Sequence, residues 1–88
     1  HMVGVIDRLL IGPDTVTVID YKSNKFVPRS AEETPDGLLR QMGAYAAALE
    51  EVFPDKTIET AILWTETGAL QKLPNSLVSS ALSRVNLP

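Results

Sequence analysis

The chain of 88 residues contains no cysteine, one tryptophan and one histidine. Without cysteine it can form no disulfide bond, thiolate zinc site or iron–sulfur cluster. The histidine opens the sequence, and the pair His1-Met2 looks like the remnant of a cloning site, so residues 1–2 are left out of account and histidine leaves the candidate metal ligands. No apolar segment reaches the length of a membrane span and no secretory signal opens the chain, so we expect a cytoplasmic protein without membrane contact.

An excess of positive charge is also lacking. The formal net charge is −3, which argues against a module that holds nucleic acid by bulk electrostatics. Any contact with phosphate must therefore be local. The length allows one small domain with a thin core, and a content of 44% hydrophobic and 22% charged residues indicates that the chain folds.

Two acids and one amine interrupt the first apolar stretches. Asp20, Tyr21 and Lys22 close a strand that begins at Val16, and Asp7 closes the first half of the strand before it. Because alternate side chains of a strand share a face, Asp20 and Lys22 should point the same way and Tyr21 the other. Two carboxylates and an amine suit the binding of a hard divalent cation and the activation of a water beside it.

The segment Gly12–Thr15 is a strong turn signal between these strands. A loop around a type I turn pairs Ile11 with Val16 and then places Asp7 directly opposite Asp20. A tight turn of the primed types is disfavoured, because the proline in this segment cannot take positive φ.

Facing acids across a ladder lie about 5 Å apart, and at an effective dielectric near 20 their repulsion is roughly 3 kcal/mol. A bound Mg²⁺ would turn this repulsion into a ligand set. Taken singly, Asp7 and Asp20 read equally well as solvated turn residues and Lys22 as a surface amine. Strands avoid Asp, however, and the combination on facing positions favours a metal site.

A helix is predicted from Pro35 to about Phe53, with Thr34 as its N-cap and Pro54 beyond its end. Its apolar positions recur at spacings of three and four and form one stripe: Leu38, Met42, Tyr45, Ala46, Leu49 and Val52. Gln41 and Tyr45 share a face of this helix. On pattern alone Tyr45 is a core residue with Gln41 as a solvated neighbour, and Arg40 is a surface cation.

Two further strands and a helix follow. Ile58–Thr65 is almost continuously apolar, which predicts a strand covered on both faces, and Ala69–Leu73 is its hairpin partner. Trp64 could stack on a base, but an indole inside an apolar strand favours a core position. Residues 75–88 form an amphipathic helix and tail. We therefore expect an α/β fold: a β-hairpin, a helix, a further strand pair and a C-terminal helix.

Three ordered motifs resemble those of the PD-(D/E)xK nucleases in their RecB-like branch: Gly4-Val5-Ile6-Asp7, then Asp20-Tyr21-Lys22, then Gln41-Met42-Gly43-Ala44-Tyr45. Their surroundings look most like the C-terminal nuclease domain of AddA-type helicase–nuclease subunits. The resemblance runs from Val3 to about Pro74. It implies a truncated restriction-endonuclease-like core at residues 3–74, in which each motif lies on the expected element.

The resemblance implies a role for each motif residue. Asp7 and Asp20 would be side-chain ligands of Mg²⁺, or of Mn²⁺, with the carbonyl of Tyr21 as a further ligand. Lys22 would orient or deprotonate the attacking water and offset charge on the phosphate. Because a lysine beside two acids favours its charged form, we favour positioning over general-base action.

The helix would supply contacts to DNA. The resemblance implies that Gln41 and Tyr45 line the site from this helix, near the DNA strand. Arg40 and Lys25 are weaker candidates for phosphate contacts.

The chain also departs from the family pattern, because the leading helix and one strand of the core are absent. That helix supplies a further ligand in RecB-like nucleases, so the isolated chain should bind metal weakly and cut poorly or not at all. The missing strand should leave an unpaired edge on Val3–Ile11, which invites self-association. The chain also begins within a strand, which leads us to expect a piece of a larger protein.

The parent would be an ATP-dependent helicase–nuclease with a metal-dependent DNA exonuclease domain, acting in double-strand break repair and recombination with an AddB-like partner. No Walker motif occurs here, so ATP would bind only in the parent's helicase domain. Two alternatives stay open: a catalytically inactive nuclease-like module that binds DNA or a partner protein, and another nuclease of this fold, such as a restriction or junction-resolving enzyme.

Overall fold

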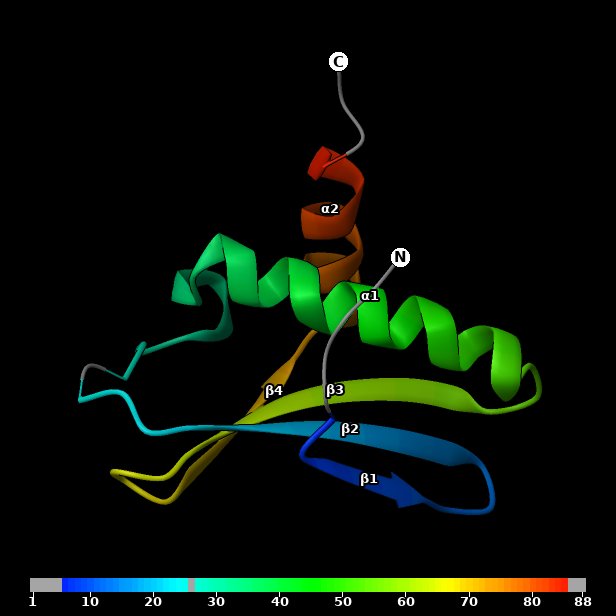
Figure 1. Cartoon of the computed structure of the whole chain (residues 1–88), viewed down its shortest axis with the longest axis horizontal. Helices are drawn as coiled ribbons and strands as arrows, with labels where there is room; N and C mark the ends of the chain where they lie inside the picture. The colour runs from blue at the N-terminus through cyan, green and yellow to red at the C-terminus, as the bar shows by residue number, and fades with distance from the viewer. Residues whose placement is uncertain (1–5, 26, 86–88) are drawn as a thin grey trace.

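The structure is a computed structural model that describes residues 6–25 and 27–85. The start of the first predicted strand, the cloning remnant and the last three residues lie outside the described residues. The elements are strands β1 (Arg8–Ile11), β2 (Thr15–Lys22), β3 (Thr57–Trp64) and β4 (Ala69–Leu73), a short 3₁₀ turn η1 (Ala31–Glu33), and helices α1 (Asp36–Val52) and α2 (Asn75–Val85). This arrangement confirms the predicted α/β fold (Figure 1).

The strands form one mixed sheet in the order β1-β2-β3-β4. β1 and β2 are antiparallel, and Ile11 pairs with Val16 as the turn signal predicts. No described residue other than glycine has positive φ, which agrees with the exclusion of primed turns. β2 and β3 are parallel, so the chain between them must cross over the sheet, and α1 makes this crossover.

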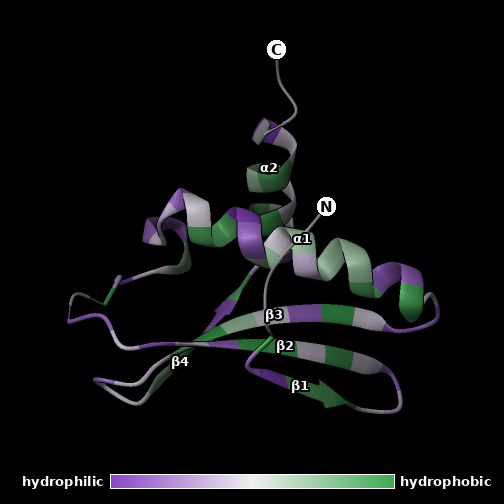
Figure 2. Cartoon of the chain, viewed as in Figure 1, coloured by the Kyte–Doolittle hydropathy of each residue, from purple (hydrophilic) through white to green (hydrophobic). Residues whose placement is uncertain are grey.

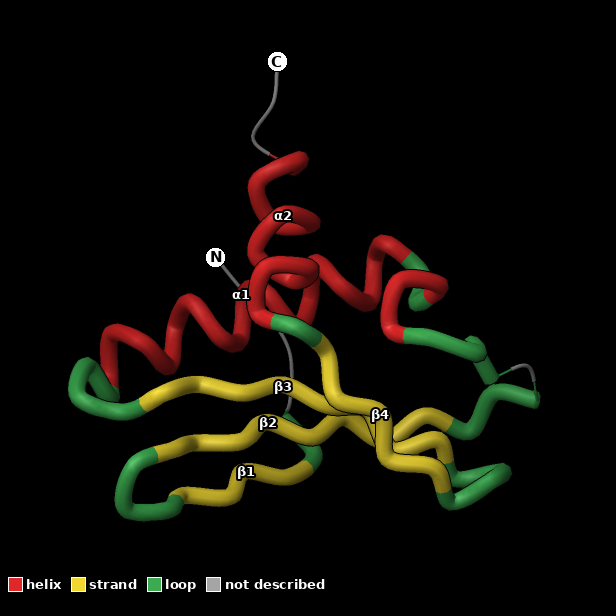
Figure 3. The backbone as a smooth tube through the Cα atoms, turned by 180° about the vertical axis from the view of Figure 1, so that it is seen from behind, coloured by secondary structure: helices red, strands yellow, loops and turns green. Residues whose placement is uncertain are grey.

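Both helices cover the same face of the sheet, as two opposite views show (Figures 1 and 3). Burial alternates along β2, where Val16, Val18 and Asp20 point towards the helices. The register continues this face across β3. On the other face Glu59 and Leu63 are partly exposed. The prediction that both faces of β3 are covered is therefore wrong for the described chain, because no described helix packs on that side.

Helix α1 begins one position later than predicted. Pro35 is its N-cap, with ψ of 138°, and its carbonyl accepts hydrogen bonds from the N–H groups of Leu38 and Leu39. The prediction of Thr34 as N-cap is therefore wrong. Thr34 instead closes η1, where its own N–H binds the carbonyl of Ala31.

The core lies between the helices and the sheet, and its buried side chains come from every element except β1 and η1: Val16, Val18, Leu39, Met42, Tyr45, Leu49, Ile58, Ile62, Trp64, Leu73, Val78 and Ala81. In Figure 2, hydrophobic segments recur along both α1 and the strands that it covers. Trp64 is 1% exposed, which agrees with its predicted core position. Val52 is 66% exposed, so its predicted burial is wrong, and Leu39 takes a core place that the predicted stripe gave to Leu38.

The two helices cross closely at Gly43. A Cβ atom at this position would lie 2.5 Å from the carbonyl oxygen of Val78 on α2. Only glycine allows this approach without a shift of the backbone. Asp36 adds an ionic link, since its carboxylate pairs with Arg40 on the same helix and with Arg84 on α2. Neither helix in the described chain has the length and apolar composition needed to cross a bilayer.

Candidate functional site

The candidate site begins at the C-terminal end of β2. Asp20 points towards the helix layer and is 4% exposed, whereas Tyr21 points to the other face and is 42% exposed. Lys22 returns to the helix side, and its Nζ lies 3.1 Å from Oδ2 of Asp20. The alternation that the strand period predicts is therefore present, and it brings an acid and an amine together on one face.

Asp7 reaches the same end of β2 from a bend just before β1, not from within a strand as predicted. The β1–β2 register would pair Ile6 with Tyr21 if the ladder continued. Instead, the Tyr21 N–H donates to Oδ2 of Asp7 at 2.8 Å. A side-chain oxygen thus takes the place of a ladder carbonyl, and this substitution explains why β1 begins only at Arg8.

The two carboxyl groups interact, and their pKa values are shifted in opposite directions. Burial raises the pKa of Asp20, and the hydrogen bond with Asp7 adds to the rise, while the Lys22 ammonium opposes it. The hydrogen bond from the Tyr21 N–H lowers the pKa of Asp7, and Asp20 and Lys22 lower it further. Of the two carboxyl groups, Asp20 therefore takes up a proton more readily than Asp7.

The donor atoms at this end of β2 fit a hard divalent cation. Oδ2 of Asp20 is buried, and the described chain offers it no hydrogen-bond partner, because the approach of Lys22 lacks hydrogen-bond geometry. The N–H and C=O of a paired strand residue point to the same side, so the Tyr21 carbonyl opens towards Asp7 as its N–H does. Two carboxylates and a carbonyl are the oxygen ligands that Mg²⁺ prefers.

Further acidic or histidine ligands are lacking in this part of the chain. Within the described residues, no three His, Cys, Asp or Glu side chains gather closely enough to hold one ion. A divalent ion held by Asp7 and Asp20 would therefore need other oxygen donors, such as carbonyls and waters.

Gln41 and Tyr45 lie on α1, above the same face of the sheet (Figure 1). The Gln41 Nε2 donates to the Tyr45 hydroxyl at 2.9 Å. The Tyr45 ring is part of the core, and the residue is 2% exposed, whereas Gln41 is half-buried. The interpretation of Tyr45 as a core residue is correct, and its hydroxyl also fixes the amide of Gln41.

The two cations proposed for phosphate contacts have different settings. Arg40 is engaged on its own helix, where Nη1 lies 2.7 Å from Oδ2 of Asp36. Lys25 is exposed in the loop after β2. Arg40 is thus held by an acid of its own helix, whereas Lys25 lies at the surface.

Thr65 supports the site, although no sequence pattern pointed to it. Its N–H and its Oγ1 both donate to the carbonyl of Lys22, at 2.8 and 3.2 Å. The two residues are 43 positions apart in the chain, and only the parallel pairing of β2 with β3 brings them together. Trp64 lies opposite Lys22 in this register, and its indole N–H donates to Gln71 at 3.3 Å.

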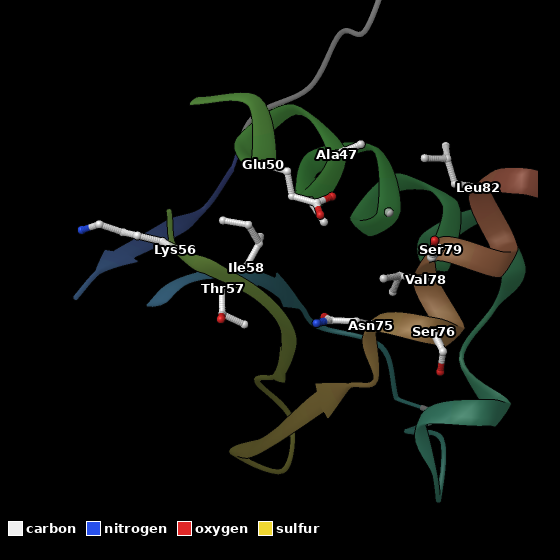
Figure 4. Close-up of a pocket in the computed structure, with 12 residues that line it drawn as sticks. Ala47, Glu50, Lys56, Thr57, Ile58, Asn75, Ser76, Val78, Ser79 and Leu82 are labelled. Carbon is white, nitrogen blue, oxygen red and sulfur yellow. The ribbon is translucent and has the colours of Figure 1, made fainter. Parts of the chain in front are cut away.

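A groove between α1, β3 and α2 encloses about 380 Å³ but contains none of these residues (Figure 4). It is lined by small and apolar side chains such as Ala47, Ile58, Ser79 and Leu82, with Glu50 and Lys56 at its rim. Its β3 residues come from the start of that strand, whereas Trp64 and Thr65 beside Lys22 lie at the other end. The candidate site is therefore the pair of carboxylates, Asp7 and Asp20, at the C-terminal end of β2 rather than this groove.

Comparison with known proteins agrees with the nuclease resemblance found in the sequence. A sequence profile described as the PD-(D/E)XK nuclease superfamily matches residues 1–82. Two curated relatives are each described as part of an ATP-dependent helicase/nuclease. The relative from Oenococcus oeni is 28% identical over 60 residues, which cover 68% of this chain and 5% of that protein. The relative from Desulforudis audaxviator is 31% identical over 68 residues, which cover 77% of this chain and 6% of that protein. The chain thus spans 5–6% of the length of these relatives, and no solved structure gave a significant match.

Proposed function

Because the chain belongs to the PD-(D/E)XK nuclease superfamily, we propose that it is part of a metal-dependent deoxyribonuclease that hydrolyses phosphodiester bonds at Asp7 and Asp20, the carboxylate pair beside the C-terminal end of β2. One observation carries this proposal. The buried Oδ2 of Asp20 has no hydrogen-bond partner in the described chain, although it lies beside a second acid and an ammonium group. Leaving a buried polar atom unsatisfied is costly, and a bound cation would remove the cost.

Asp7, Asp20 and the carbonyl of Tyr21 would hold the ion, and Mg²⁺ or Mn²⁺ suits these oxygen donors. When bound, the ion supplies a positive charge that stabilises the reacting phosphate and lowers the pKa of a water. The protein contributes the position of its ligands. The backbone of β2 fixes Asp20, and the hydrogen bond from the Tyr21 N–H fixes Asp7.

Lys22 would position the attacking water and offset charge on the phosphate. Its carbonyl is held by two donors of Thr65, and its ammonium lies 3.1 Å from Asp20. An ammonium group in this place can stabilise the negative charge of a phosphate and donate a hydrogen bond to a water. We therefore assign Lys22 an electrostatic and positioning role rather than that of a general base.

Gln41 would present a polar group to the DNA strand, and the buried Tyr45 would hold it in place through its hydroxyl. Their mutual hydrogen bond restricts both side chains, which reduces the entropy lost when a ligand is bound. Lys25, exposed after β2, would add a phosphate contact. Arg40 is a weaker candidate, because Asp36 already engages its guanidinium.

We further propose that the parent protein is an ATP-dependent helicase–nuclease of the AddA type. The two relatives are described as belonging to such enzymes, and they match this chain over 68% and 77% of its length. In such a parent the nuclease would cut DNA as an exonuclease during double-strand break repair, with an AddB-like partner. ATP would bind in the helicase part of that protein.

The test is cleavage of single-stranded DNA by a longer chain that contains the parent's upstream sequence. We expect cleavage with Mg²⁺ or Mn²⁺, and its loss with EDTA. Asp20→Ala and Lys22→Gln should each lower the rate by at least about 10²-fold, because each removes a charge that acts at the reacting phosphate. Asp14→Ala, at an exposed acid in the β1–β2 turn, is the matched control and should cut like the wild type.

A second measurement reads metal binding without activity. Calorimetric titration of Mn²⁺ should detect one site in the wild type that Asp20→Asn removes. If the longer chain binds DNA but neither binds Mn²⁺ nor cuts, the fold acts as an inactive binding module and the nuclease proposal is wrong. If Asp20→Ala cuts at the wild-type rate, the site assignment is wrong.

A further inference from the structure

Arg84, in the last turn of α2, lies beside the start of α1 and belongs to none of the motifs of the sequence. Its Nη2 pairs with Oδ1 of Asp36, and Nη1 of Arg40 lies 2.7 Å from Oδ2 of the same carboxylate. The side chains of Asp36, Arg40 and Arg84 are 50%, 41% and 48% exposed. Two guanidinium groups thus share one acid and form a surface cluster, the arginine cluster, with one unbalanced positive charge.

This local excess of positive charge contrasts with the rest of the chain, whose formal net charge is −3. The other end of α1 is acidic, because Glu50 and Glu51 lie in its last turn and Asp55 follows it, all three exposed. A helix of this length spans about 25 Å, which is well beyond the screening length of roughly 8 Å at physiological salt. An anionic ligand is therefore attracted to the start of α1 and repelled from its end.

The two guanidinium groups have donors to spare. Arginine has five N–H donors, and Asp36 engages one nitrogen of each side chain. The remaining donors have no partner among the described residues. Nη2 of Arg40 lies over Gly37, 3.7 Å from where a Cβ atom of that residue would be. Because a guanidinium fork matches the oxygens of a phosphate, the cluster can bind one while Asp36 stays in place.

The surface of α1 connects the arginine cluster with the candidate site. The start of α1 and the C-terminal end of β2 lie at the same end of the molecule (Figure 1). Successive helix residues point about 100° apart, so Arg40 and Gln41 lie on different flanks of α1, with Gly37 and Ala44 between their directions. Neither of these two residues has a side chain beyond Cβ. A DNA strand can therefore cross α1 closely from Gln41 to Arg40.

We propose that Arg84 and Arg40 together bind a phosphate of the DNA strand that is cut at the carboxylate pair, and that Asp36 holds both guanidinium groups in position before DNA binds. This inference rests on the proposed nuclease function, because it takes DNA as the substrate. Arg40 by itself is balanced by Asp36, and Arg84 restores the positive charge. The close crossing of α1 and α2 at Gly43 fixes the two arginines relative to one another.

Binding of a labelled oligothymidylate of about 20 nucleotides, measured by fluorescence anisotropy in EDTA, tests the contact without cleavage. The protein is the longer chain that contains the parent's upstream sequence. Arg84→Gln should weaken binding about fivefold, because it removes a charge-assisted hydrogen bond to phosphate. The slope of log Kd against log salt concentration should fall by about 0.7, the value for one contact to a single strand.

Lys72→Gln is the matched control, because it removes the same charge elsewhere. Lys72 is exposed on β4 and pairs with Ala61, so it lies on the face of the sheet away from the helices. This variant should bind the oligonucleotide within about twofold of the wild type, since a charge on that face is screened from the arginine cluster.

Asp36→Asn separates a phosphate contact from a purely structural bridge between the helices. It removes the acid that balances the two arginines, so DNA binding should tighten about threefold, although the contact between α1 and α2 weakens. A structural bridge alone predicts the opposite, because the substitution would then only loosen the helices. Asp55→Asn, at an exposed acid beyond the other end of α1, should change the affinity by less than about twofold.

Two results would overturn the inference. The first is an Arg84→Gln variant with the affinity and salt dependence of the wild type. The second is an Asp36→Asn variant that binds as weakly as Arg84→Gln, which would assign the cluster to helix packing. Thermal unfolding of each variant checks that the substituted chains remain folded at the temperature of the binding measurement.

Failure of the nuclease proposal gives a different pattern. A chain that cuts DNA with neither Mg²⁺ nor Mn²⁺, but whose DNA binding still falls in Arg84→Gln and rises in Asp36→Asn, supports the phosphate contact and contradicts catalysis at the carboxylate pair. A wild-type chain that cuts DNA, with Arg84→Gln binding equally well, supports catalysis and contradicts the phosphate contact.

Discussion

The environment of Asp20 shifts its carboxyl group towards the uncharged, protonated form. It is buried on the helix face of β2, and both burial and the hydrogen bond with Asp7 raise its pKa. Folding therefore favours the protonated form of Asp20. Its contribution to stability is fully present below the unfolded pKa of about 3.9 and is lost as the pH rises through the higher folded pKa.

Replacing this acid should consequently stabilise the metal-free protein. We expect Asp20→Asn to raise the free energy of unfolding by about 1 kcal/mol at pH 7, because the amide has no charge to desolvate. The gain should shrink as the pH falls through the raised pKa of Asp20, because the wild-type side chain then becomes protonated. Asp7, whose pKa folding lowers, is present in both proteins.

Urea unfolding in EDTA at several pH values measures this difference. Asp14→Asn, at an exposed acid in the turn, should show no such pH-dependent gain. A loss of stability for Asp20→Asn at pH 7 would contradict the prediction. Such a result would mean that the ion pair with Lys22 outweighs the desolvation of Asp20.

The positions of the site residues were predictable from the sequence only where the alternation of side chains along a strand determines them. The alternation of β2 placed Asp20 and Lys22 on one face, and the turn signal gave the register that brings Asp7 near them. The bend at Asp7 was not predictable, because it depends on a hydrogen bond between its own carboxylate and Tyr21. Thr65 was missed because its partner, Lys22, lies far away in the sequence.

Among the elements, the orientation of α1 depends on the residues that it packs against. Its length followed from the apolar spacing and from Pro54, and the structure agrees. The sequence did not decide which leucine faces the core, because both Leu38 and Leu39 fit a spacing of three and four. Packing places Leu39 inside. Val52 is exposed although it continues the pattern, because periodicity does not reveal where the contact with the sheet ends.

Gly43 gives the packing of α1 against α2 a testable consequence. Gly43→Ala improves helix propensity by about 1 kcal/mol, but its Cβ would lie 2.5 Å from the Val78 carbonyl oxygen. We expect a net loss of about 1–3 kcal/mol in stability, because the helices must separate or bend to admit the methyl group.

Gly37→Ala is the matched substitution on the same helix. Its Cβ would meet only the end of the Arg40 side chain, at 3.7 Å, so we expect a gain of about 0.4–1 kcal/mol. Thermal unfolding of both variants measures the two effects. If Gly43→Ala gains as much as Gly37→Ala, the close helix crossing is not needed for stability.

At the scale of the whole molecule, the fold class and the family were accessible from three short motifs. The superfamily match over residues 1–82 confirms the resemblance, and the mixed sheet with its crossover helix confirms the α/β fold. The open face of the sheet was not predictable. The apolar run in β3 reads as buried on both sides whether or not a second layer of helices is present.

Metal binding should stabilise the folded chain as a whole. At a Mg²⁺ concentration ten times the dissociation constant, the free energy of unfolding should rise by about 1.4 kcal/mol. For a domain of this size, such an increase corresponds to a rise of several degrees, roughly 5–10 °C, in the melting temperature.

The fluorescence of Trp64, the single tryptophan, follows this transition, and this residue lies beside Lys22 in the register. Asp20→Asn should melt at the same temperature with and without Mg²⁺. A shift of equal size in Asp20→Asn would show that the ion acts elsewhere on the surface.

The pair of hydrogen bonds from Thr65 to the Lys22 carbonyl also orders events in time. A ribosome releases Asp7, Asp20 and Lys22 long before it releases Thr65, 43 residues after Lys22. Within the described chain, the hairpin made by then has no third strand beside it, and a lone pair of strands is marginally stable in water. In a nascent chain, the end of β2 is therefore held in place only after β3 has emerged. Asp7 and Asp20 reach their final positions late in synthesis.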